Sequence, residues 1–173
     1  GILARRGDPA HVRAVGAQGL IDLVVVNLYP FEHTVQQPGV SLQEAVEQID
    51  IGGVALLRAG AKNFAHVAVV CQPGQYAEVA QALRQGHGAL PDTLSRGLAV
   101  TAFQVTSTYD TAVLGYLGGS GDGSTSPEVA TVTVRKRQGL RYGVNPHQGG
   151  AWYVPASGPV WGLGTLSQLQ GKA

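Results

Sequence analysis

The sequence has 173 residues, of which 44% are hydrophobic and 13% are charged, and its formal net charge is +1. This length and composition can bury the core of a domain, which excludes a disordered or solvating chain. A net charge this close to zero argues against nucleic-acid binding by bulk electrostatics, and no apolar run approaches the roughly 18 residues of a membrane span.

The first two thirds of the chain alternate between helical and strand patterns, which predicts an α/β fold with parallel strand pairing. Each expected helix begins at a capping residue, a proline or a glycine pair, as helix starts usually do. The capping box Ser41-x-x-Glu44 is one such start. The helices are expected at 10–17, 42–48, 54–61, 74–84 and 92–117, and the strands at 21–26 and 66–70. The continuous apolar run at 21–26 predicts a strand buried on both faces.

Residues 118–127 (GGSGDGSTSP) have the composition of a flexible linker, so we place a domain boundary there. After the linker, a strand is expected at 130–136, with short extended pieces at 152–153 and 160–161. The expected organisation is therefore one domain at 1–117, the linker at 118–127 and the start of a second domain at 128–173.

One candidate site lies at 49–63 (IDIGGVALLRAGAKN), where Asp50 and a glycine pair precede a helix that ends at Lys62. Backbone N–H groups at such a helix entrance can bind an oxyanion or a carboxamide oxygen, and Lys62 can act as a general acid/base if a pocket buries its amine. Two simpler interpretations stay open. Asp50 can merely cap the helix, and a lysine in the last turn can merely complement the helix dipole.

Asn27 and Tyr29 follow the strand at 21–26, and ligands bind at the carboxyl edge of open α/β sheets. A strand-terminating turn, with Tyr29 packed on its neighbours, is the alternative. A second polar cluster lies at 141–148 (RYGVNPHQ). There Arg141 can hold a phosphate and Tyr142 can stack on a base, although a plain surface turn explains the same residues.

Three motifs, IDLVVVNLYPFE, VEQIDIGGVALLRAGAKN and RYGVNPHQ, occur here in order and at suitable spacing. They resemble the family of bifunctional purine-biosynthesis enzymes that join inosine-monophosphate (IMP) cyclohydrolase to aminoimidazole-carboxamide-ribonucleotide formyltransferase. The resemblance implies a partial methylglyoxal-synthase-like α/β domain with a parallel sheet and flanking helices, followed by the start of a second α/β domain, the transferase. It also implies a cytoplasmic protein that is a homodimer at full length, uses 10-formyltetrahydrofolate as co-substrate and requires no metal.

By the same resemblance, Lys62 would be the proton donor/acceptor of the cyclisation, with Tyr29 and Asp50 assisting. Arg141 and Tyr142 would lie in the nucleotide site of the transferase. Residues expected to hold the base of the cyclohydrolase substrate are Val26, Asn27, Asp50, Ile51 and Gly52.

The family's phosphate-binding loop would precede this chain, and the catalytic Lys-His pair and folate site of its transferase would follow it. We therefore expect the chain to be an internal piece that is inactive alone. Within the match, Gly60 replaces a usual alanine, which should weaken its helix by about 1 kcal/mol. Val144 and Gln170 replace a frequent glutamate and a frequent histidine. The alternative function is a non-catalytic regulatory module that binds a ligand with the same α/β fold.

Overall fold

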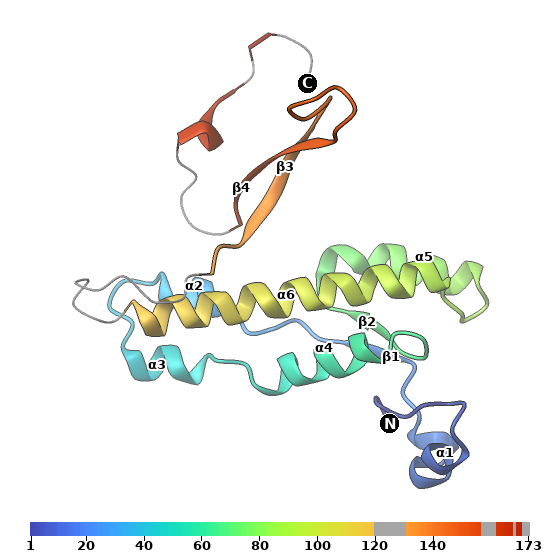
Figure 1. Ribbon diagram of the computed structural model, residues 1–173. Coiled ribbons are helices and arrows are strands. Elements are labelled where there is room, and N and C mark those ends of the chain that lie inside the picture. Colours follow the sequence, from blue (N-terminus) through green and yellow to red (C-terminus); the bar gives the residue numbers. More distant parts are fainter. Residues whose placement is uncertain (120–130, 157–161, 168, 171–173) are drawn as a thin grey trace. The chain divides into compact units, whose positions relative to one another are not determined.

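The computed structural model describes residues 1–119, 131–156, 162–167 and 169–170 (Figure 1). The chain forms two compact units, Gly1–Gly121 and Asp122–Ala173. Most of the expected linker, and the extended piece expected at 160–161, lie outside the described residues. No helix within the described part of the chain is both long enough and apolar enough to cross a membrane.

The first unit is a two-stranded parallel sheet with helices packed against it, which confirms the α/β prediction (Figure 1). The strands pair in register, with Val24 beside Val69. The elements in chain order are α1 (Pro9–Val15), a 3-10 turn (Ala17–Gly19), β1 (Leu23–Val25), α2 (Phe31–Val35), α3 (Leu42–Glu47), α4 (Gly52–Lys62), β2 (Ala68–Val70), a second 3-10 turn (Pro73–Gln75), α5 (Tyr76–Gln85) and α6 (Asp92–Gly118).

The main core forms where α4 and α6 pack against the sheet. Leu57 of α4 is fully buried there, together with Val69 of β2 and Ala102 of α6. A smaller cluster packs α5 and the first turns of α6 against Val70. α4 and α6 lie side by side on the sheet. The faces of the two helices that point away from the sheet are therefore adjacent.

Gly60 lies where α4 packs against the two strands of the sheet. A Cβ atom at this position would lie 3.3 Å from the Cβ of Val69 and 3.7 Å from the Cβ of Val24. The glycine therefore does more than weaken the helix, since it lets the backbone of α4 lie directly against both strands.

β1 differs from its prediction. Val24 is buried, but Leu23 and Val25 on the other face are 40% and 50% exposed. The expectation of a strand buried on both faces is therefore wrong for the described residues. The apolar run correctly predicts a strand, but it carries no information on which part of the protein covers each face.

Local capping signals are confirmed. The Ser41 hydroxyl accepts a hydrogen bond from the Glu44 N–H, and the Glu44 carboxylate accepts one from the Ser41 N–H at 2.8 Å, so the capping box is complete. At the C-terminal end of α4, the Asn63 backbone N–H caps the helix. The Asn63 side-chain amide donates to the carbonyls of Ile2 and Ala4, at 2.8 and 3.1 Å. Asn63 thereby ties the N-terminal segment to the end of α4.

The second unit contains an antiparallel hairpin of β3 (Val134–Leu140) and β4 (Gly150–Pro155), and a 3-10 turn (Gly162–Thr165). The strand expected at 130–136 thus begins and ends later than predicted. A bulge interrupts the pairing between Lys136 and Gln138. At the bulge, the Arg137 guanidinium lies 5.1 Å from the centre of the Trp152 ring and donates to the Gly164 carbonyl, so it links the turn to the hairpin.

Candidate functional site

Apart from Lys62, the residues predicted from the two N-terminal motifs lie at the carboxyl ends of β1 and β2, beside the entrance of α4. Val26 extends the pairing beyond β1, because its N–H donates to the Val70 carbonyl at 3.0 Å. The Asn27 side-chain amide then donates to the Tyr76 hydroxyl at 2.7 Å. This bond joins the segment after β1 to the first residue of α5, so both strand ends contribute to one edge.

Asp50 lies at the entrance of α4 and holds two segments together. Its Oδ1 accepts from the Gly53 N–H at 2.6 Å, and its Oδ2 accepts from the Tyr29 N–H at 3.3 Å. The first bond has the geometry of a helix cap, so the structure supports the capping interpretation of Asp50. The second bond brings Asp50 and Tyr29 together, as the site prediction requires. The Tyr29 side chain itself is 56% exposed.

The two glycines at the entrance of α4, Gly52 and Gly53, have different surroundings. A Cβ on Gly53 would lie 2.5 Å from Oδ2 of Asp50, whereas a Cβ on Gly52 would meet nothing within 4 Å. A side chain at position 53 would therefore displace the Asp50 carboxylate from the position in which it caps the helix. Among the residues described here, the N–H groups of Ile51 and Gly52 have no hydrogen-bond acceptor. These two amides remain available for an oxygen atom of a ligand.

Tyr109 on α6 is part of this site, and the sequence analysis missed it. Its hydroxyl accepts from the Asp50 N–H at 2.7 Å and donates to the Gln48 carbonyl at 3.0 Å. A signal was present, because Tyr109 continues the helical spacing of the buried residues Ala102 and Thr106. The spacing alone indicates a partly buried ring and does not show that its hydroxyl reaches a distant turn.

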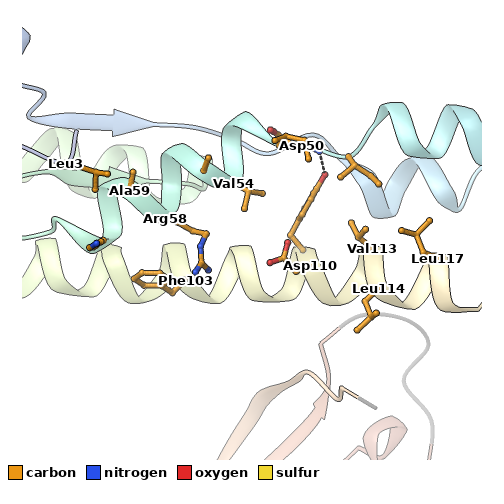
Figure 2. A pocket seen from close by; sticks show the side chains of 15 residues that line it. Leu3, Asp50, Val54, Arg58, Ala59, Phe103, Asp110, Val113, Leu114 and Leu117 are labelled. Carbon is orange, nitrogen blue, oxygen red and sulfur yellow. Dashed lines mark hydrogen bonds between the residues drawn. The ribbon is translucent and has the colours of Figure 1, made fainter. Parts of the chain in front are cut away.

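An open groove of about 930 Å³ runs between α4 and α6 (Figure 2). The helices are antiparallel, since Asp50 contacts Tyr109 at one end and the Arg58 guanidinium lies 5.6 Å from the centre of the Phe103 ring nearer the other. The lining is mostly apolar, and its charged residues are Asp50, Arg58, Lys62 and Asp110.

Lys62 lines the same groove but lies far from the helix entrance. Ten residues of helix separate it from Gly52, which corresponds to about 15 Å along the axis. Its side chain is exposed, and no carboxylate in the described ranges forms an ion pair with it. The structure therefore brings Tyr29 and Asp50 together but does not bring Lys62 to them, and the expected burial of its amine is not provided by these residues.

Arg141 and Tyr142 lie in the loop between β3 and β4 and are exposed. The loop is closed by a bond from the Gly143 N–H to the Gln148 carbonyl at 2.7 Å. A nucleotide-binding role for these two side chains stays a prediction. For metal ions, the described residues contain no group of three or more His, Cys, Asp or Glu side chains able to hold one.

Because Gly53 and Gly52 differ so sharply in the space around them, alanine at each position gives a matched test of the cap. We expect Gly53→Ala to lower the free energy of unfolding by about 1–2 kcal/mol, as the loss of a cap does. Gly52→Ala should leave it unchanged or raise it slightly, because alanine favours helix. Urea denaturation of both variants measures the difference, and equal stabilities would contradict the capping role of Asp50.

Comparison with known proteins agrees with this architecture. The family model for an MGS-like domain matches residues 4–55, which places the first unit among α/β proteins of that class. The model for the AICARFT/IMPCHase bienzyme matches residues 60–173, about two thirds of the chain. The chain belongs to the AICARFT/IMPCHase bienzyme family.

The curated relatives include the bifunctional purine biosynthesis protein PurH of a Cyanothece species, 50% identical over 99% of this chain and 34% of its own length. PurH of Listeria welshimeri is 44% identical, again over 99% of this chain and 34% of its own length. A solved structure, titled "Crystal structure of ForH", matches with a TM-score of 0.60 and 37% identity, covering 69% of this chain and 62% of its own. The chain thus spans about a third of the length of the PurH proteins it matches.

Proposed function

We propose that this chain is part of a bifunctional purine-biosynthesis enzyme that performs the last two steps of IMP formation. Residues 1–117 belong to its cyclohydrolase domain, 118–127 to a linker and 128–173 to the start of its formyltransferase domain. The co-substrate of the transferase is 10-formyltetrahydrofolate, whose site lies outside this chain, and the whole protein is a homodimer. The observation that carries the proposal is the contact of Asp50 with Tyr29 at the carboxyl edge of the sheet, in a chain of this family.

In the cyclisation, the carboxamide nitrogen of formylaminoimidazole-carboxamide ribonucleotide attacks the formyl carbon. A carbon–nitrogen bond forms, the nitrogen loses a proton and the formyl oxygen gains one. The hydroxyl group then takes a second proton and leaves as water, while the former formamide nitrogen loses its proton and a carbon–nitrogen double bond forms. The protein must move these protons and stabilise charge on oxygen. We assign the proton transfers to Lys62 and the holding of the substrate base to the N–H groups of Ile51 and Gly52, which have no acceptor among the described residues.

The distance between Gly52 and Lys62 along α4 limits how the substrate can bind. A base held at the Gly52 amide must extend along the groove toward Lys62, because the lysine cannot reach the helix entrance itself. Side chains of a helix lean toward its N-terminus, so the lysine is directed back along this path. The phosphate is held by a part of the parent protein outside this chain. For this reason we expect the chain to be inactive alone.

A full-length chimera tests this proposal. The matching third of the Cyanothece PurH is replaced by this chain, which is 50% identical to it, and cyclisation and formyl transfer are assayed separately. We expect the chimera to perform both reactions. A folded chimera that transfers formyl groups but does not cyclise the product would contradict the proposed cyclohydrolase role.

One observation favours the alternative, a regulatory module that binds a ligand without reaction. Both carboxylate oxygens of Asp50 already accept bonds from the backbone, which is a structural rather than a catalytic use. Under this alternative, the folded chimera would transfer formyl groups but would not cyclise the product. The two functions are therefore separated by whether the folded chimera cyclises the formylated nucleotide.

A further inference from the structure

The turn that precedes α4 is fastened to α6 by one hydroxyl group. The Tyr109 oxygen lies 2.7 Å from the Asp50 nitrogen and 3.0 Å from the Gln48 oxygen, so it serves as acceptor and donor for the same turn. Both contacts join residues about 60 positions apart in the sequence. They fix the backbone immediately before the N–H groups of Ile51 and Gly52.

The ring of Tyr109 is fixed in turn by its neighbours. Its centre lies 6.1 Å from that of Phe31, which is 1% exposed and begins α2. Phe31 follows Tyr29 by two residues, and the Tyr29 N–H donates to the Asp50 carboxylate. Tyr109 therefore touches both chain segments that meet at the site, the one after β1 and the one before α4.

The hydroxyl keeps its proton under ordinary conditions. Burial raises the pKa of Tyr109 above its usual value, and the carboxylates of Asp50 and Asp110 raise it further, against a lowering by the Asp50 N–H bond. At neutral pH the group is therefore a neutral phenol that can donate to Gln48. Neither bond is lost by titration near pH 7.

We propose that Tyr109 is a positioning residue of the cyclohydrolase site. It holds the turn at 48–50 so that the amides of Ile51 and Gly52 and the carboxylate of Asp50 keep the orientation in which they bind the base. This role rests on the proposed function. It does not require Tyr109 to contact the substrate, since the hydroxyl is already engaged by the turn.

The test is Tyr109→Phe, which keeps the ring packed on Phe31 and removes the hydroxyl alone. In the 173-residue chain, amide hydrogen exchange measured by NMR should accelerate about tenfold at Asp50, which loses its acceptor, and stay unchanged at Leu57 within α4. In the chimera, KM for the formylated nucleotide should rise about tenfold, with formyl transfer unaffected. Tyr153→Phe, in the hairpin, is the matched control and should change neither quantity.

Two results would overturn the proposal. Unchanged exchange at Asp50 together with an unchanged KM would show that the hydroxyl does not hold the turn. Faster exchange throughout α4 and α6 would show that Tyr109 only stabilises the fold. If the chimera with the native tyrosine does not cyclise at all, the proposed function fails instead, and the exchange measurement alone decides whether Tyr109 fixes the turn.

Discussion

Replacing Lys62 with alanine in the chimera is expected to slow cyclisation by a factor of about 10²–10⁴, the usual contribution of a general acid/base. Formyl transfer should remain nearly intact, because the transferase site is assigned to other residues. The loss should appear in kcat, since the lysine acts on protons in transit rather than on ground-state binding. Separate single-turnover assays of the two reactions measure this difference directly.

Lys136→Ala is a suitable control for the Lys62 variant. It removes the same charge from an exposed position on β3, outside the groove, and should leave cyclisation unchanged. Cyclisation that survives Lys62→Ala at its full rate would contradict the assignment of the proton transfers to Lys62. An equal loss in both lysine variants would instead indicate a general effect of charge.

The largest effect on stability is expected from Leu57→Ala. Leu57 is fully buried between α4, the sheet and α6, and a leucine truncated in such a core costs about 2–5 kcal/mol because a cavity remains. The adjacent Leu56 is 43% exposed, so Leu56→Ala should cost less than about 1 kcal/mol. Chemical denaturation of the two variants of the 173-residue chain gives the comparison.

Neighbouring leucines provide a strict control, because the residue type, the helix and the local helix propensity are the same. Similar losses for Leu56 and Leu57 would mean that α4 does not pack on the sheet as described. A chain that shows no cooperative transition even with both leucines present would mean that the first unit requires the remainder of its parent protein to fold.

Signals that act within a few residues were predicted well. The capping box of Ser41 and Glu44 forms as expected, and Asp8 caps the helix that begins at Pro9. Both depend on one side chain and one nearby N–H group, so the sequence contains all the information needed. The long helix α6 begins at Asp92, as its proline and aspartate predict.

Features that depend on distant residues were not predicted. The link from Tyr109 to Asp50 spans 59 positions, and nothing near either residue indicates the other. The exposure of Leu23 and Val25 has the same origin, because burial depends on what covers a strand. For the site, the structure brings Asp50 beside Tyr29, while the length of α4 keeps Lys62 at a distance that the motif alone does not reveal.

The close fit between Asp50 and Gly53 couples two positions that lie three residues apart. A side chain at position 53 would meet the carboxylate at position 50, and the carboxylate loses its helix-capping bond if it moves away. Substitutions at the two positions should therefore be non-additive in their effect on the free energy of unfolding.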